Sequence, residues 1–211
     1  MSVINDTSAV AEQPLNEQPL NEQQPPPTAN PDQGPGQRIS GSAAKSLAVL
    51  RIGLGFVFLW AFFDKAFGFS YATPSAKAWI SGGSPTNGFL SSVEVGPFQS
   101  VFNSIAGSWW ADLIFMVGLL GIGAALMLGV ALRIAAVSGA VMMAGMWLAE
   151  FPIARFTSTG EANGSSNPFV DYHVIYALAL VAVALCYAGN IWGLGKVWAR
   201  VPVVSQHNWM R

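Results

Sequence analysis

The stretch RIGLGFVFLWAFFDKAFG, residues 51–68, decides the fold, because it is a long apolar run with charges at both ends. Only twelve uncharged residues separate Arg51 from Asp64. At about 1.5 Å per residue, a helix of that length covers roughly 18 Å, which is less than the ~30 Å hydrocarbon core of a bilayer. If this run crosses a membrane, Arg51 or the pair Asp64 and Lys65 lies at hydrocarbon depth. Arg51 can snorkel along its long stem toward the cytoplasm, whereas the short Asp64 cannot.

The composition of the chain points to the same environment. Hydrophobic residues make up 52% of the 211 residues and charged residues only 10%, whereas a soluble domain carries about 25% charged residues. The net charge is −1 and the chain has no basic patch, so we expect no nucleic-acid partner. The single cysteine, Cys186, excludes an internal disulfide and a CxxC redox pair.

The chain divides into three parts by composition. Residues 1–42 are rich in Gln, Pro, Asn and Glu and repeat the motif EQPLN. Such a tract buries too little apolar surface to fold, so it predicts a disordered cytoplasmic tail. Residues 43–200 form the predicted membrane domain, and residues 201–211 a cytoplasmic C-terminal tail.

Four apolar runs predict an all-α, integral membrane four-helix bundle, since backbone inside lipid must pair within a helix. Each run is close to the ~20 residues that a crossing needs. The runs are residues 44–67, 110–129, 132–151 and 172–193. Seven Lys and Arg residues then fall on the side of the two termini and three on the other, which predicts an N-in, C-in orientation. The first two runs are joined by a long outer loop, in which PFQSVFNSIAG (residues 97–107) predicts a short amphipathic helix.

This orientation places ionisable groups at the outer end of every span. They are Asp64 and Lys65 in the first span, Asp112 in the second, Glu150 in the third, and Asp171 and His173 in the fourth. Asp112 and Asp171 suit helix N-termini and need no function there. Asp64 and Glu150 oppose the helix dipole, so each needs another reason: a salt bridge such as Lys65 to Glu150, or a ligand or proton site. We expect one shared polar cluster beneath the outer surface.

The cluster resembles a site for a quinone headgroup, which takes up protons when it is reduced. The predicted catalytic residues are Glu150, His173 and Asp171, with Glu150 and His173 exchanging protons. The predicted substrate-binding residues are Asp64, Lys65, Trp147, Tyr176 and Asp112, and Lys65 would polarise a carbonyl. A lone histidine near the bundle makes no bis-His haem site, and no Cys/His metal spacing is present, so we expect no metal.

Three stretches of the chain resemble the DoxX/DoxD family. They are RIGLGFVFLWAFFDKAFG (51–68), GIGAALMLGVALRIAAVSGAVMMAGMWLAEFP (121–152) and NPFVDYHVIYALALVAVALCYAGNIWGLGKVW (167–198). The loop piece WISGGSPTNGFL (79–90) is similar to the DoxD-like branch, the small membrane subunit of thiosulfate:quinone oxidoreductases. The resemblance covers roughly residues 45–200 and implies a four-helix protein of the bacterial inner membrane. It implies roles for Arg51, Lys65, Arg133, Asp171 and His173.

The leading hypothesis is a quinone-interacting membrane subunit of an oxidoreductase complex, linked to sulfur compounds or thiols. Quinone would be the substrate, and no cofactor would be covalently bound, because the chain supplies no flavin, haem or iron–sulfur ligands. The alternatives are a non-enzymatic membrane anchor for a soluble redox or sulfur-handling protein, and a small transporter with a proton relay. Whether the chain is itself an enzyme stays open at this point.

Overall fold

A computed structural model describes residues 41–210, and every regular element in this range is helical. The predicted tail, residues 1–42, lies outside the described residues except for its last two, which begin α1. The helices are α1 (Gly41–Phe67), α2 (Asn87–Ser91), α3 (Gln99–Ile105), α4 (Trp109–Leu128), α5 (Leu132–Glu150), α6 (Tyr172–Leu185), α7 (Gly195–Trp198) and α8 (Pro202–Gln206), with the 3-10 turns η1 (Ser75–Lys77), η2 (Trp79–Ser81), η3 (Ala188–Asn190) and η4 (Asn208–Met210).

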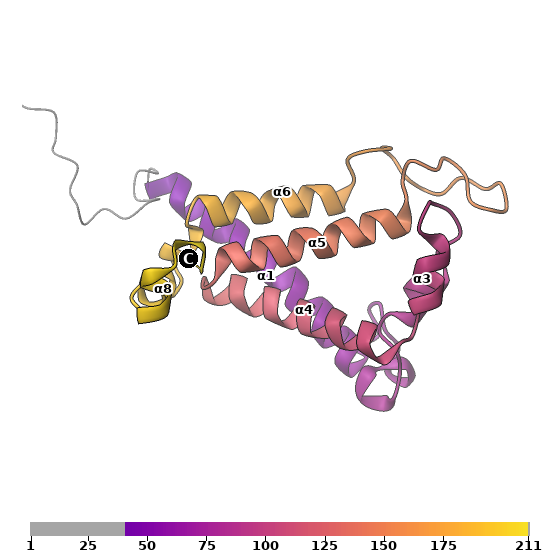
Figure 1. The fold of residues 1–211 in the computed structure, drawn as a ribbon, viewed down its shortest axis with the longest axis horizontal. Helices are drawn as coiled ribbons and strands as arrows, with labels where there is room; N and C mark the ends of the chain where they lie inside the picture. The colour runs from indigo at the N-terminus through magenta and orange to yellow at the C-terminus, as the bar shows by residue number, and fades with distance from the viewer. Residues whose placement is uncertain (1–40, 211) are drawn as a thin grey trace, which may run out of the picture. The chain divides into compact units, whose positions relative to one another are not determined.

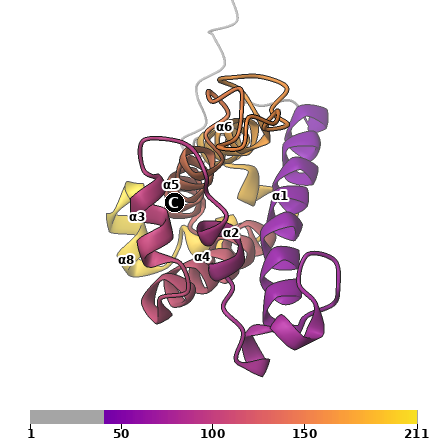
Figure 2. The ribbon, with the colours of Figure 1, turned by 90° about the vertical axis from the view of Figure 1, so that its right-hand side faces the viewer.

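The four long helices pack side by side around one apolar core (Figures 1 and 2). α1 lies against α4, and α5 lies against α6, while contacts of α4 with α5 and of α1 with α6 close the ring. The core consists of buried aliphatic, Met and Phe side chains from all four helices. It includes Leu54, Phe58, Met116, Leu119, Ile122, Leu126, Met143, Leu180 and Val183.

Two glycines allow the close contact between α1 and α4. A Cβ atom on Gly55 would lie 2.9 Å from the backbone nitrogen of Met127. A Cβ atom on Gly123 would lie 2.8 Å from the backbone nitrogen of Leu59. Small residues are common where membrane helices approach this closely, so these two positions set the spacing of the pair.

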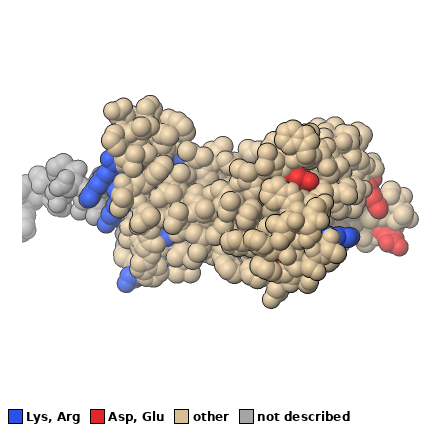
Figure 3. Space-filling view, turned by 90° about the horizontal axis from the view of Figure 1, so that it is seen from below, with Lys and Arg blue, Asp and Glu red and all other residues tan. Residues whose placement is uncertain are grey.

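Length and composition make the chain a multi-pass membrane protein. α1, α4 and α5 are each long and apolar enough to cross a bilayer. Their outward faces carry large apolar side chains, such as Phe56, Val117 and Val141, which are more than half exposed. Figure 3 shows one face, where charged side chains gather toward the two ends and a band without visible charge separates them. Exposed apolar surface of this extent is expected where lipid covers the protein.

The fourth helix is shorter than the sequence predicts. Residues 172–193 were expected to form one span, but α6 ends at Leu185, after 14 residues, or about 21 Å. Tyr187 adopts a left-handed backbone conformation with φ 52°, and η3 follows. The chain leaves the helix here and turns its carbonyl groups toward the side chain of Arg51.

Arg51 is the polar centre of this end of the bundle. Its side chain does not reach solvent, because Arg51 is 0% exposed. Its guanidinium donates hydrogen bonds to five backbone carbonyls, those of Leu126, Met127 (3.0 Å), Ala188 (3.2 Å), Ile191 (3.3 Å) and Trp192 (2.9 Å). Two of these carbonyls belong to the last turn of α4, where a cation meets the negative end of the helix dipole. Arg51 therefore joins α1, α4 and the segment after α6.

The predicted loop helix and the C-terminal tail both take part in the fold. The helix predicted within residues 97–107 is confirmed as α3. The C-terminal segment, expected to be a tail, forms α8 and η4, and η4 contacts α5. Trp198 Nε1 donates a 2.7 Å hydrogen bond to the carbonyl of Met210, and Val204 is buried. These contacts hold the segment against the end of the bundle.

Candidate functional site

The structure brings together the three residues that the sequence predicts as catalytic. Glu150 is the last residue of α5, and Asp171 directly precedes α6. The Nδ1 atom of His173 lies 2.8 Å from Asp171 Oδ2 and 3.9 Å from Glu150 Oε2. The His173 side chain is only 1% exposed, whereas that of Glu150 is 36% exposed. The group therefore joins a buried ring to the solvent at the end of α5 and α6.

Asp171 has the structural role expected of an acid before a helix. Its Oδ1 atom accepts hydrogen bonds from the backbone N–H groups of His173 (3.0 Å) and Val174 (3.2 Å), which caps α6. Burial alone would raise the pKa of the Asp171 carboxyl. The hydrogen bonds from His173 and Val174 outweigh burial and hold this pKa below its ordinary value.

The structure gives the other two outer aspartates separate partners. Asp64 is buried at the end of α1, and its carboxylate accepts hydrogen bonds from the backbone N–H groups of Tyr71 (3.2 Å) and Ala72 (3.0 Å). Asp112, in the first turn of α4, accepts bonds from Ser84 Oγ (2.9 Å) and from the N–H (2.9 Å) and hydroxyl (2.6 Å) of Thr86. Each acid thus fixes a part of the outer loop.

Lys65 lies beside an aromatic ring and an apolar pocket, unlike the acids at the outer ends of the spans. Its Nζ atom lies 6.0 Å from the centre of the Phe115 ring. Among residues 41–210 it forms no ion pair, so the predicted bridge to Glu150 is absent from the described structure. Instead, Lys65 lines a pocket of about 940 Å³ between α4 and α5.

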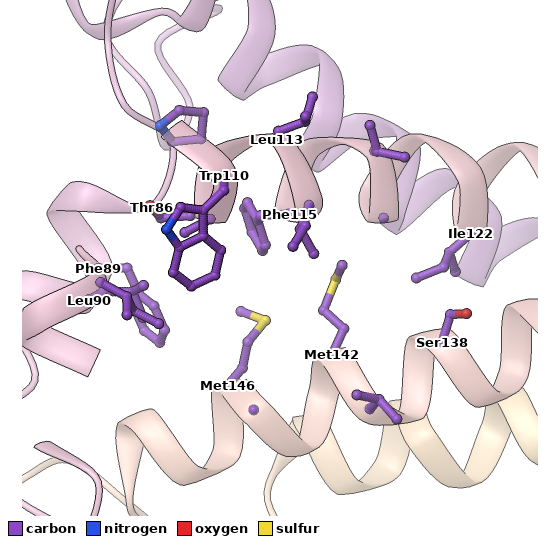
Figure 4. Close-up of a pocket in the computed structure, with 18 of the residues that line it drawn as sticks. Thr86, Phe89, Leu90, Trp110, Leu113, Phe115, Ile122, Ser138, Met142 and Met146 are labelled. Atoms are coloured by element: carbon purple, nitrogen blue, oxygen red, sulfur yellow. The ribbon is translucent and has the colours of Figure 1, made fainter. Parts of the chain in front are cut away.

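This pocket is apolar almost throughout (Figure 4). Phe115 on α4 and Met142 and Met146 on α5 extend into the space between the two helices. At one end, α2 and α3 contribute further apolar side chains, namely Phe89, Leu90, Phe102 and Ile105. Of the described residues that line the pocket, only Lys65 is titratable. The arrangement suits an elongated apolar ligand with one polar group.

The two predicted aromatic residues lie in the bundle near the α5–α6 group. The Trp147 ring is 6.5 Å from that of Phe151, and its buried Nε1 atom has no hydrogen-bond partner among the described residues. Tyr176 packs against the core, with its ring 6.1 Å from that of Tyr172. Neither of them lines the α4–α5 pocket.

Sequence reasoning missed the residues of the pocket itself. Phe115, Met142 and Met146 lie within apolar runs, where nothing in the sequence separates a pocket lining from an ordinary core residue. The one available signal is the presence of small residues on the facing surfaces, Gly118 on α4 and Gly145 on α5. A Cβ atom on Gly145 would meet nothing within 4 Å, so this position borders open space.

These features define a helical multi-pass membrane protein with a large apolar pocket between two of its long helices and a carboxylate–histidine group at the end of another pair. No family model, curated protein or solved structure matches the chain.

Proposed function

We propose that this protein binds a quinone in the pocket between α4 and α5, as a membrane subunit of an oxidoreductase complex. The observation that carries the proposal is the combination of an apolar pocket of about 940 Å³ with a single lysine in its lining. Ligand pockets commonly measure about 300–1,000 Å³ and combine apolar walls with a few polar groups. A quinone has the matching form, an apolar ring and tail with two carbonyl oxygens.

Lys65 supplies the polar contact in this proposal. An ammonium group donates a hydrogen bond to a quinone carbonyl, and it stabilises the negative charge that develops on that oxygen during reduction. The Phe115 ring lies beside the ammonium, and the methionines of α5 adapt readily to the shape of a ligand. The ring would therefore lie near Lys65, with the tail along α4 and α5.

The predicted proton exchange at Glu150 and His173 stays a separate prediction. Neither residue lines the pocket, so the proposal gives them no direct contact with the headgroup. Replacing Glu150 by Gln tests this role: unchanged quinone turnover in that variant would remove Glu150 from the mechanism.

The proposal also includes the topology and location of the chain. α6 would be the fourth crossing, completed by the segment that follows it. The N-terminus of α1 and the C-terminus would face the cytoplasm of a bacterium, since Lys45, Arg133, Lys196 and Arg200 then lie on the inner side. The resemblance to the DoxX/DoxD family supports the same arrangement and a link to sulfur-compound or thiol oxidation.

Quinone titration of the full chain in lipid nanodiscs tests the proposal. Binding of a short-chain ubiquinone is followed by quenching of tryptophan fluorescence, because Trp110 lines the pocket. We expect Gly145→Leu to abolish binding, since its side chain would extend from a wall of the pocket. Gly121→Leu is the matched control: it makes the same change on α4, outside the pocket lining, where an added Cβ also meets nothing within 4 Å.

A second variant separates quinone binding from the filling of the pocket by any lipid tail. Lys65→Met should weaken ubiquinone binding about tenfold, since a hydrogen bond to a charged group contributes about 1.5 kcal/mol. It should leave binding of decylbenzene, which has no carbonyl group, unchanged. Lys77→Met, in the exposed outer loop, serves as control. Equal quinone affinity in Lys65→Met and unmodified protein contradicts the proposed headgroup contact. A soluble protein that co-purifies without quinone would favour the membrane-anchor alternative.

A further inference from the structure

We propose that Glu150, Asp171 and His173 form a binding site for a divalent transition-metal ion at the end of α5 and α6. The ligand atoms that the three side chains offer all lie within 4.8 Å of one another. They comprise one imidazole nitrogen and one oxygen from each of two carboxylates. The inference is independent of quinone binding, because none of the three residues lines the α4–α5 pocket.

The two carboxylates are held so that each keeps one oxygen for the ion. Asp171 uses Oδ1 to cap α6, which leaves Oδ2 beside His173 Nδ1 at 2.8 Å. Glu150 uses Oε1 to accept a 2.8 Å hydrogen bond from the Tyr172 hydroxyl, which leaves Oε2 at 3.9 Å from the same nitrogen. Hydrogen bonds that orient ligands in this way are a regular feature of metal sites in proteins.

Among the described residues, the side chain of His173 makes polar contacts only within this group. Its side chain is 1% exposed, and its other nitrogen, Nε2, is buried with no hydrogen-bond partner among the described residues. The orientation of the ring is therefore fixed by packing and by the contact of Nδ1 with the carboxylates. In the metal-free protein Nδ1 lies 2.8 Å from Asp171 Oδ2, and an ion bound between these atoms would displace any proton that they share.

The site has both an access route and a charge that suits a dication. Glu150 is 36% exposed at the end of α5, so an ion can enter from solvent and keep water in its remaining coordination positions. A neutral imidazole with two carboxylates carries a charge of about −2, which a divalent cation neutralises. Imidazole combined with carboxylate favours transition metals such as Zn²⁺ over Mg²⁺ and Ca²⁺, which prefer oxygen ligands alone.

Titration of the EDTA-treated full chain in detergent with ZnCl₂, followed by calorimetry, tests the site. The chain carries His207→Ala and no histidine tag, because His207 is exposed and offers a second imidazole. We expect one Zn²⁺ per chain, bound more tightly than Mn²⁺, with no competition from Mg²⁺. Glu150→Gln should weaken binding at least tenfold, and Tyr172→Phe, which releases Glu150 Oε1, about tenfold.

Glu161→Gln is the matched control, because Glu161 is an exposed acid in the segment between α5 and α6 and lies outside the group. It should bind Zn²⁺ like the unmodified chain. Circular dichroism checks that Glu150→Gln keeps its helices. We expect it to keep them, because the Glu150 side chain is 36% exposed. No binding at micromolar Zn²⁺, unchanged binding in Glu150→Gln, or equal competition by Mg²⁺ would each overturn the inference.

Discussion

Replacing Arg51 by Met should destabilise the fold by about 3 kcal/mol. Arg51 is fully buried and donates five hydrogen bonds to backbone carbonyls of α4 and of the segment after α6. Side-chain hydrogen bonds inside membrane proteins contribute about 0.6 kcal/mol each on average, so five such bonds give a loss of about 3 kcal/mol. Met is apolar and donates no hydrogen bond, so all five contacts are lost, although the Leu126 carbonyl keeps its 3.2 Å bond from the Gly129 N–H.

The free energy of unfolding can be measured by titrating the protein with SDS in mixed micelles, with helix content as the signal. Arg51→Lys keeps the charge but presents three donors on one nitrogen, so it should recover only part of the loss. Lys45→Met, which removes an exposed cation from the same helix, is the control and should stay near the unmodified value. The reasoning fails if Arg51→Met unfolds at the same SDS fraction as Lys45→Met.

Three further predictions concern packing, the outer loop and pH. Gly123→Leu forces a side chain against the backbone of α1 and should cost about 1–3 kcal/mol in the SDS titration; a value equal to that of Gly121→Leu would refute the close packing. Asp112→Asn weakens the bonds that fix the outer loop and should speed hydrogen exchange at the Thr86 amide about tenfold; unchanged exchange would speak against this anchor. In EDTA-treated protein, the pKa of Asp171 is lowered in the folded state. Its ionised carboxylate therefore contributes fully to the free energy of unfolding above its ordinary pKa near 3.9, and this contribution falls as the pH drops further. Asp171→Asn should therefore show a flatter loss of stability as the pH falls below about 4, and parallel curves would contradict the prediction.

The helices were predictable wherever hydrophobicity alone determines them. The predicted spans 110–129 and 132–151 agree within a residue or so with α4 and α5, since a continuous apolar run ended by Gly129 leaves few alternatives. The span 172–193 was predicted too long for a different reason. The sequence after Leu185 is still apolar, but its carbonyls bond to Arg51, a residue 137 positions earlier in the case of Ala188. A contact between residues so far apart in the sequence cannot be predicted from the local pattern of apolar residues.

The candidate sites were predictable only where the residues are neighbours in the sequence. Asp171 and His173 lie two residues apart at a helix start, so their contact follows from the capping pattern. The grouping of Glu150 with them required the correct pairing of α5 with α6, which the order of the spans favours. The separate partners of Asp64 and Asp112 depend on the path of the outer loop, and the sequence does not determine that path.

The quinone content of protein purified from native membranes tests the central claim most directly. After lipid extraction, the account predicts close to one quinone per chain in the unmodified protein and in Gly121→Leu, and almost none in Gly145→Leu. An absence of quinone from the unmodified protein, or equal amounts in the two glycine variants, would contradict a quinone site between α4 and α5.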